Sequence, residues 1–302
     1  MKNQLFLILI LLSQTCFAQY KDTLLSVNGT SLFIREIGTG TPIIIVHGGP
    51  GLNHAYFLPH LNPLSKKYRL IFYDQRACGN SSGNLDSSQM TLNLFTEDIE
   101  SIRQTLNLGN IAVLGHSWGA LVAMKYAIKY PNHISRLFLS NSISPKAGEF
   151  ETETNQRLKS RMSADDSIRR RTILASQAFK EGNVEAYAQI LKLSFKFSFY
   201  NIRKFEQLDI ELPVDYLAKR KLLFFMAKEL SVYDLYPSLN KISCPTLIIH
   251  GAYDGIPDDL SKKMKEYIPG AELTVIQKAG HFPFIEQKKT YNQIIDRFLA
   301  EQ

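Results

Sequence analysis

The fold of this chain is constrained most by a serine motif flanked by two glycines. It lies where an apolar run passes into a helical pattern. The motif is Gly115-His116-Ser117-Trp118-Gly119, and it follows the apolar run 111–114 directly. A helical pattern then continues over 118–130 and ends at Pro131. Strand, sharp turn and helix form the context in which a G-x-S-x-G motif presents a nucleophilic serine. Glycines suit that turn, because a Cβ would clash where the backbone is strained and neighbouring chains pass close by.

Short apolar runs recur along the chain and predict the strands of one sheet. They lie at 43–46, 69–73, 111–114, 137–139, 246–249 and 273–276. Runs of this length are typical of parallel strands buried on both faces. Helical patterns separate them, at 92–106 after Thr91 as N-cap, at 118–130, at 258–267 and at 291–299. The alternation predicts an α/β fold with a mostly parallel sheet flanked by helices.

Two regions depart from this alternation. Alternating runs at 23–27 and 31–37, joined through Asn28-Gly29, predict a β-hairpin at the start of the sheet. The stretch 142–240 is rich in charge and in helix formers, and it predicts a helical cap inserted between two parts of the sheet domain, 19–141 and 241–302. Within the cap, alternate residues from Leu193 to Phe199 are apolar, which is strand spacing, and we expect them to face the sheet domain.

The first 18 residues predict export. Lys2 precedes the apolar run 5–12, and the small residue Ala18 follows, which is typical of a secretory signal peptide cleaved after Ala18. The run is shorter than the roughly 20 residues that span a bilayer, so we expect no stable membrane insertion after cleavage. Lipid attachment at Cys16 is the alternative, although the residues before it do not resemble a lipobox. The expected location is secreted or periplasmic.

Charge and composition exclude several kinds of partner. The formal charge of +7 comes from 35 basic and 28 acidic residues without a long block of one sign, so no nucleic-acid partner is expected. No phosphate-binding or dinucleotide pattern occurs, and no cluster has the spacing of metal ligands, so we expect neither a cofactor nor a metal. Cys78 and Cys244 remain after signal cleavage, and we expect two free thiols. Nothing in the sequence defines an oligomeric state.

A serine hydroxyl needs a base, and the base needs a partner that holds its tautomer. We predict His281 as the base, because it follows the run 273–276 and precedes the last helical pattern, at the edge where open α/β sheets place their sites. His133 and His250 are the other candidates. His133 precedes a predicted strand, and His250 ends one, which favours a buried structural role.

The acid that supports the base is expected in the loop after the run 246–249. Asp254 lies there, in His250-Gly251-Ala252-Tyr253-Asp254-Gly255. Asp258 and Asp259 follow, but carboxylates at those positions complement the first turn of a helix. The chain thus contains the order Ser117, Asp254, His281 that a hydrolytic triad on this kind of sheet requires.

The oxyanion of an acyl-transfer intermediate needs two backbone N–H donors held in place before reaction. We predict one donor as Trp118, the residue after the nucleophile. The other is expected from the loop His47-Gly48-Gly49-Pro50-Gly51, which follows the early apolar run 43–46. Glycines there let the backbone approach the reacting group closely.

With these residues in place, the chain resembles the proline iminopeptidase (prolyl aminopeptidase) branch of the α/β-hydrolases. The resemblance rests on residues 47–51, on Asp74-Gln75-Arg76-Ala77-Cys78-Gly79-Asn80-Ser81, on the motif 115–119, and on Asp254 and His281. It implies the α/β-hydrolase fold with an inserted helical cap, and a serine aminopeptidase that releases N-terminal proline-type residues from short peptides through an acyl-enzyme. It also implies Gly49 as the second oxyanion donor, and mainly structural roles for Asp74 and Arg76.

The chain departs from that family at His116 and Ala77, where the family more often has glycine, and in the cap. There the family binds the substrate ammonium with glutamates, one of them beside a tryptophan, but Trp118 is the only tryptophan here. The candidate substrate-binding residues are Gly48, Glu206, Glu211 and Glu229. A carboxylesterase or lactonase with the same triad is the alternative enzyme. An inactive binding protein on the same fold is disfavoured, because triad and oxyanion elements are all present.

Overall fold

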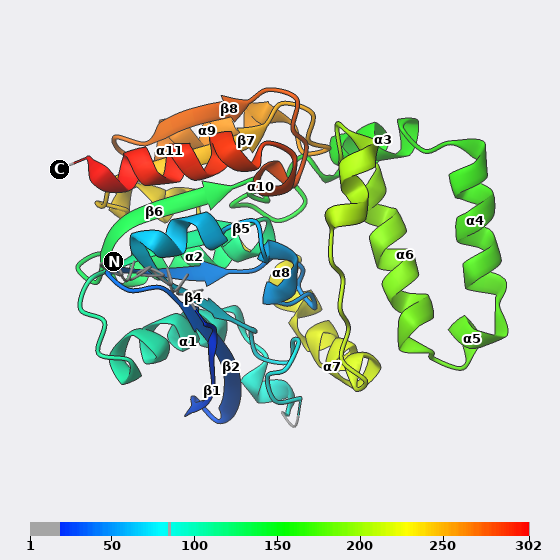
Figure 1. Cartoon of the computed structure of the whole chain (residues 1–302), viewed down its shortest axis with the longest axis horizontal. Coiled ribbons are helices and arrows are strands. Elements are labelled where there is room, and N and C mark those ends of the chain that lie inside the picture. The colour runs from blue at the N-terminus through cyan, green and yellow to red at the C-terminus, as the bar shows by residue number, and fades with distance from the viewer. Residues whose placement is uncertain (1–18, 84–85, 302) are drawn as a thin grey trace, which may run out of the picture.

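In the part of the chain that the structure describes, eight strands form one sheet in the order β1-β2-β4-β3-β5-β6-β7-β8 (Figure 1). The computed structural model describes residues 19–83 and 86–301, so the predicted signal peptide lies outside the described residues. The strands are β1 (Lys21–Val27), β2 (Thr30–Ile37), β3 (Thr41–Val46), β4 (Tyr68–Tyr73), β5 (Ile111–His116), β6 (Ile134–Ser140), β7 (Thr246–Gly251) and β8 (Glu272–Ile276). β2 is antiparallel to β1 and β4, and all other neighbours are parallel. The predicted mostly parallel sheet is confirmed.

The first two strands form the predicted hairpin. Asn28 has a φ of 47° and Gly29 a φ of 72°. Positive φ at both central residues is what a two-residue turn of the I′ type requires, and its twist matches the twist of the strands that it joins. The dipeptide Asn28-Gly29 therefore sets the register in which Val27 pairs with Thr30.

Both faces of the sheet are covered, which explains the continuous apolar runs. Ile44 and Val46 belong to one core cluster, with side chains from α1 (Leu92–Thr105), α2 (Trp118–Lys129) and α9 (Asp258–Tyr267). Ile43 and Ile45 belong to the opposite cluster, with side chains from α10 (Pro283–Glu286) and α11 (Lys288–Ala300) and from the short 3-10 helices η1 (His54–Phe57) and η2 (Asn62–Lys66). Successive side chains of a strand point to opposite faces, so a strand covered on both sides needs apolar residues at every position.

The predicted helices agree closely with the observed ones. The Thr91 hydroxyl accepts a hydrogen bond from the Leu94 N–H at 3.2 Å, which makes Thr91 the N-cap of α1. The helix α9 has the predicted bounds, and α11 begins three residues earlier than the pattern 291–299 indicates. Within the described residues, no helix is long and apolar enough to span a membrane.

Helices make up the inserted region between β6 and β7. They are α3 (Glu151–Ser160), α4 (Ala164–Ala175), α5 (Gln177–Lys180), α6 (Val184–Lys196), η4 (Ile202–Gln207), α7 (Tyr216–Leu223), η5 (Phe224–Met226), α8 (Ala227–Leu230) and η6 (Tyr236–Lys241). Figure 1 shows α4 and α5 farthest from the sheet, and α7 and α8 beside it. Leu239 of η6 is buried in the same core cluster as side chains of α2.

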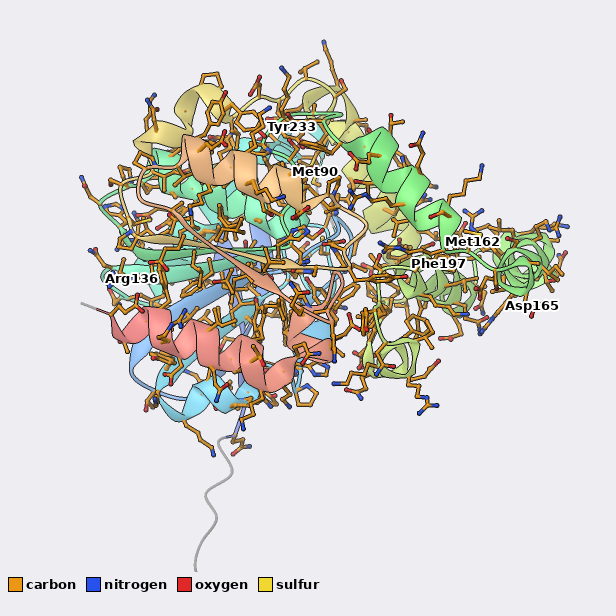
Figure 2. All side chains as sticks on the ribbon, turned by 90° about the horizontal axis from the view of Figure 1, so that it is seen from above. Met90, Arg136, Met162, Asp165, Phe197 and Tyr233 are labelled. Atoms are coloured by element: carbon orange, nitrogen blue, oxygen red, sulfur yellow. The ribbon has the colours of Figure 1, made fainter. Side chains whose placement is uncertain are left out.

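The apolar alternation from Leu193 to Phe199 arises from a helix end, not from a strand. α6 ends at Lys196, and a turn continues the buried face. Phe199 stacks on Phe282 of the sheet domain, with ring centroids 5.1 Å apart, and Phe197 is also buried. In Figure 2, Phe197 lies toward the core and Asp165 at the outer end of the cap. The expectation that this segment faces the sheet domain therefore agrees with the structure.

The loop after β4 holds α1 against the sheet through a buried ion pair. Arg76 donates from Nε and Nη2 to the two carboxylate oxygens of Asp98 on α1, at 2.8 and 2.6 Å, and from Nη1 to the Gln89 carbonyl. The side chains of Arg76 and Asp98 are 0% and 1% exposed. Asp74 accepts hydrogen bonds from the backbone and ring of His54 and from the Asn80 N–H. Both residues make structural contacts of the kind that the family resemblance implies.

Replacement of Arg76 by methionine should lower the free energy of unfolding by about 3–5 kcal/mol, because it leaves Asp98 buried without its countercharge. Urea denaturation of wild type and variant measures this loss. Arg35→Met is the matched control, since Arg35 pairs with Asp22 in an exposed position, where loss of a pair costs about 0–1 kcal/mol. Equal losses in the two variants would contradict a structural role for the buried pair.

Candidate active site

Ser117 lies at the junction of β5 and α2 in a strained backbone conformation. Its φ is 55° and its ψ is −122°, outside the regions that residues with a Cβ prefer. Such strain costs about 1–3 kcal/mol and occurs mostly at functional sites. All other residues from Ile111 to Met124 are buried, whereas Ser117 is partly exposed. The predicted strand–turn–helix unit thus presents its serine at the surface of an otherwise buried segment.

The two motif glycines are required by close backbone approach. A Cβ on Gly115 would overlap the backbone of Gly119 and Ala120, and a Cβ on Gly119 would overlap the carbonyl oxygens of Val46 and His47. These overlaps are with backbone atoms, which cannot rotate away. The glycines therefore let the turn, the helix and the end of β3 meet at one point, as the motif predicts.

Asp254 and His281 form a hydrogen-bonded pair at the same edge of the sheet. His281 Nδ1 is 2.8 Å from Asp254 Oδ2, and both side chains are buried. The same carboxylate oxygen accepts from Asn141 Nδ2 at 2.7 Å, and Oδ1 accepts from the Ile256 N–H. Burial alone would raise the pKa of Asp254, but attraction to His281 and the hydrogen bonds from His281 and Asn141 lower it to about 2. Asp254 is therefore ionised across ordinary pH.

The loop that carries His281 packs directly against the serine turn. The ring centroids of His116 and His281 are 4.9 Å apart, and His116 Nε2 is 2.8 Å from the His281 carbonyl oxygen. Among the described residues, no hydrogen bond joins Ser117 to His281. Such bonds are often long before substrate binds and tighten in the reacting complex. Because Asp254 occupies Nδ1 of His281, Nε2 is the nitrogen left to take a proton.

The alternative histidines and acids have other hydrogen-bond or ion-pair partners. His250 is buried, with Nδ1 3.0 Å from the Ser261 hydroxyl, and His133 pairs with Glu100 of α1. Asp258 and Asp259 lie in the first turn of α9, and both pair with a lysine of the same helix. The structure therefore unites Asp254 with His281 and gives these four residues other partners.

Two free backbone N–H groups are available near Ser117. Within residues 19–83 and 86–301, neither Gly49 N nor Trp118 N has a hydrogen-bond acceptor. The Gly48 N–H, by contrast, donates to the Tyr56 hydroxyl at 2.6 Å. A Cβ on Gly48 would lie 3.1 Å from Ser117 Cβ, so the loop passes directly beside the serine. Gly49, with a φ of 128°, is exposed there.

The loop 47–51 is locked to the loop after β4. His47 Nε2 accepts from the Gln75 N–H at 3.0 Å, and the Gln75 amide donates to the His47 carbonyl at 2.6 Å. His47 Nδ1 then donates to the Gly48 carbonyl at 2.8 Å. Gln75 also accepts from the indole Nε1 of Trp118 at 2.9 Å. Burial lowers the pKa of His47 to about 4, so this ring is neutral and its tautomer is defined.

The cap reaches the site through specific contacts. Arg161 donates to the carbonyl oxygens of Tyr253 and Asp254 at 2.8 and 3.3 Å, and its guanidinium lies 3.8 Å from the centre of the Tyr253 ring. The His281 N–H donates to the Ser198 carbonyl at 2.8 Å. Leu223 of α7 lies beside Gly51, because a Cβ added to Gly51 would be 3.2 Å from Leu223 Cδ1. The cap thus contacts the acid loop, the base loop and the glycine loop.

The candidate substrate-binding residues have other partners. Glu206, whose side chain is 76% exposed, pairs with Lys192, and Glu229 accepts from the Leu92 N–H at the start of α1. Glu211 is exposed, and its carbonyl accepts from Asn53. No contact among the described residues links these glutamates to the triad. Both backbone polar groups of Gly48 are occupied, so Gly48 contributes close approach and not a free donor.

The remaining sequence expectations concern metals and thiols. The described residues contain no cluster of side chains that could hold a metal ion. Cys78 and Cys244 are both free and buried, as expected. Burial raises the pKa of the Cys78 thiol to about 12, which makes it unreactive.

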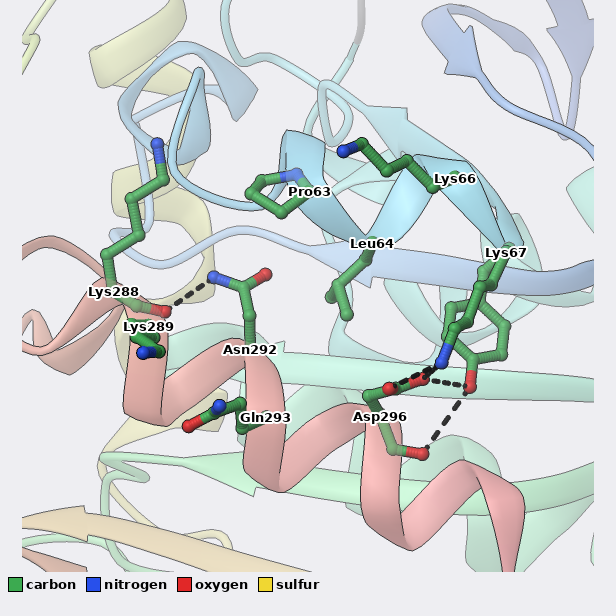
Figure 3. A pocket seen from close by; sticks show the side chains of 10 residues that line it. Pro63, Leu64, Lys66, Lys67, Lys288, Lys289, Asn292, Gln293 and Asp296 are labelled. Carbon is green, nitrogen blue, oxygen red and sulfur yellow. Dashed lines mark hydrogen bonds and ion pairs between the residues drawn. The ribbon is translucent and has the colours of Figure 1, made fainter.

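A separate hollow between η2 and α11 is lined partly by lysines, and it includes none of the predicted site residues (Figure 3).

Over residues 41–288 the sequence matches the family described as alpha/beta hydrolase fold. The chain is an α/β hydrolase. A proline iminopeptidase of Heyndrickxia coagulans is 29% identical over 272 residues, which cover 87% of this α/β hydrolase and 92% of that protein. The predicted fold and the resemblance to the proline iminopeptidase branch are thereby confirmed.

Solved structures share the fold of this α/β hydrolase. A proline iminopeptidase of Mycobacterium smegmatis superposes with a TM-score of 0.70 at 19% identity, covering 92% of this chain and 97% of that chain. An esterase from Exiguobacterium antarcticum superposes with a TM-score of 0.67 at 21% identity, covering 94% and 100%. Both amide and ester hydrolases therefore use closely similar scaffolds.

Sequence reasoning missed three residues that organise this α/β hydrolase site. Asn141, after β6, bonds both Asp254 and the Gly280 carbonyl. Glu286 is buried and accepts from the backbone N–H groups of Gly280, Tyr200 and Asn201, so it ties the cap to the base loop. Tyr56 bonds Gly48 and His116. Asn141 follows a strand at the sheet edge where Asp254 and His281 lie, a signal that could have found it, whereas the others depend on tertiary contacts.

Proposed function

We propose that this α/β hydrolase is a serine hydrolase that acts through an acyl-enzyme, with Ser117 as nucleophile, His281 as base and Asp254 as supporting acid. The observation that carries the proposal is the His281–Asp254 pair packed beside a strained, accessible serine, with two N–H groups free nearby. A base oriented by a carboxylate and a preorganised pair of donors are the parts that acyl transfer requires.

The proposed steps use these groups in order. Ser117 Oγ attacks the substrate carbonyl carbon while its proton passes to Nε2 of His281, and the oxyanion accepts hydrogen bonds from the N–H groups of Gly49 and Trp118. Asp254, ionised and bonded to Nδ1, stabilises the imidazolium that forms. The bond to the leaving group then breaks as His281 returns the proton to it. Water, deprotonated by His281, then attacks the acyl carbon; the bond to Ser117 Oγ breaks, His281 returns the proton to Oγ, and the acid is released.

The substrate class that we propose is a short peptide or arylamide with a free N-terminal residue of the proline type. Support comes from relatives named proline iminopeptidase, such as that of Heyndrickxia coagulans, which align with most of the chain. The inserted helical region also contacts the acid loop, the base loop and the glycine loop beside Ser117. An exopeptidase has to neutralise the ammonium of its substrate in a site shielded from water, because an unpaired buried charge is costly.

A small ester or lactone is the second candidate substrate. The observation that favours it is that two of the cap glutamates already have other partners: Glu206 pairs with Lys192, and Glu229 accepts from the Leu92 N–H. An ester needs no countercharge at that place. The triad and oxyanion groups would perform the same steps, with an alcohol as leaving group.

A substrate panel distinguishes the two classes. Proline and alanine p-nitroanilides should be hydrolysed, and acetylation of the substrate amine should lower kcat/KM by about 10²-fold or more, because a buried charge pairing of roughly 3 kcal/mol is lost. Short-chain p-nitrophenyl esters are assayed in parallel, with Ser117→Ala measuring the background. Equal rates on free and acetylated arylamides, or hydrolysis of esters alone, would replace the aminopeptidase assignment by the esterase one.

A further inference from the structure

Three hydrogen bonds connect parts of the site that lie far apart in the sequence. The Gly48 N–H donates to the Tyr56 hydroxyl at 2.6 Å, and that hydroxyl is 2.9 Å from Nδ1 of His116. Nε2 of His116 is 2.8 Å from the carbonyl oxygen of His281. The series runs from the glycine loop, through the residue before the nucleophile, to the backbone of the base.

The donors and acceptors of this series have one consistent assignment. The His281 carbonyl can only accept, so Nε2 of His116 carries the proton. Nδ1 of neutral His116 is then an acceptor, and the Tyr56 hydroxyl donates to it while its oxygen accepts from the Gly48 N–H. Burial lowers the pKa of His116 to about 3, which keeps the ring neutral in ordinary buffers. Every polar group in the series is satisfied.

Each end of the series carries one component of the proposed chemistry. Gly48 precedes Gly49, whose N–H has no acceptor among the described residues, and the Gly48 N–H donates to the Tyr56 hydroxyl. His116 precedes Ser117 in the turn after β5. Among the described residues, His116 is the only one whose side chain bonds to the backbone of His281. Tyr56 and His116 are each 1% exposed and cannot rotate freely.

We infer that Tyr56 and His116 are positioning residues that hold the oxyanion loop, the nucleophile turn and the base loop in one arrangement. This inference rests on the proposed function, because the proposed function assigns the roles of Ser117, His281 and Gly49, the groups that Tyr56 and His116 position. Removal of the Tyr56 hydroxyl leaves the Gly48 N–H and Nδ1 of His116 buried without partners, so both loops can shift to find new ones. A displacement of about 1 Å at reacting groups can cost roughly 10²-fold in rate.

The rate of covalent labelling by a fluorophosphonate measures this arrangement without a known substrate. In Tyr56→Phe, the first-order rate constant of labelling should fall by roughly 10- to 100-fold, with little change in the concentration for half-maximal rate. Tyr73→Phe is the matched control, because the Tyr73 hydroxyl is buried and has no partner among the described residues. Rates are normalised to the folded fraction measured by circular dichroism, so loss of folded protein does not count as loss of positioning.

Nuclear magnetic resonance of ¹⁵N-histidine protein tests the series in wild type and needs no variant. His116, assigned by its disappearance in His116→Gln, should be a neutral ring protonated on Nε2 between pH 5 and 8. Its Nδ1 resonance should move in Tyr56→Phe as the hydrogen bond to the hydroxyl is lost. A ring protonated on Nδ1, or one that titrates in this range, would overturn the series even if Tyr56→Phe failed to fold.

The outcomes separate this inference from the proposed function. If wild type is labelled and Tyr56→Phe reacts as fast as Tyr73→Phe, the positioning role is wrong and the triad assignment stands. If Ser117 is not labelled in wild type, the proposed function fails, and the positioning role fails with it. The tautomer of His116 still reports whether the hydrogen bonds exist.

Discussion

Replacement of Ser117 by alanine should abolish turnover, with kcat falling by roughly 10⁵-fold or more, as in other hydrolases whose triad serine is removed. The variant should also lose covalent labelling by a fluorophosphonate, because alanine has no hydroxyl for the probe to phosphonylate. Mass spectrometry of the labelled wild type should place the adduct on the peptide that contains Ser117. The fold should remain, since alanine fits the partly exposed position.

Ser101→Ala is a suitable control for that experiment. Ser101 lies on α1, and among the described residues its hydroxyl bonds only the side chain of Asn28. Its removal should leave turnover and labelling within about twofold, because a surface change away from special features has small effects. Labelling of Ser117→Ala at the wild-type rate would refute the nucleophile assignment and direct attention to another serine.

Replacement of Asp254 by asparagine should lower kcat by roughly 10⁴-fold while substrate binding changes little. The amide of asparagine can present N–H to Nδ1 of His281, which forces the proton onto Nε2 and removes the base. In the other orientation the tautomer is kept, but the charge that stabilises the imidazolium is lost. Steady-state kinetics on the most active substrate of the panel gives kcat and KM separately.

Asp258→Asn is the matched control for Asp254→Asn. Asp258 is a nearby carboxylate in the first turn of α9, and it pairs with Lys262. Its neutralisation should leave kcat within about twofold, since surface pairs of this kind contribute little. Wild-type turnover in Asp254→Asn, or equal losses in the two variants, would remove Asp254 from the mechanism.

The catalytic edge could be predicted from the sequence because local signals converge there. The glycines of 115–119 indicate a turn that only residues without a Cβ can build, and the apolar run before them indicates a buried strand. Asp254 and His281 each follow a strand of the same sheet. Parallel strands end at one edge, so three loops far apart in the chain were expected together before any contact was known.

The cap could not be predicted to the same depth. Its helical character follows from composition, but the partners of its charged residues depend on how short helices pack. The Glu229 carboxylate accepts from the Leu92 N–H in the first turn of α1, and Glu206 pairs with Lys192. Nothing in the local sequence distinguishes these two residues from other surface glutamates. Glu286 likewise gained its three N–H donors only because the chain around Tyr200 returns to the base loop.

The sequence by itself determined the succession of strands and helices along the chain, the turn that carries Ser117, and the residue types available as base and acid. These are consequences of periodicity and of glycine geometry, which act over a few residues. Only the tertiary structure showed that, among the described residues, the Gly48 N–H has an acceptor and the Gly49 N–H has none, and that Asn141, Tyr56 and His116 bond to predicted site residues. Such choices depend on which buried polar groups meet, and burial without a partner is costly enough that packing, not local pattern, selects them.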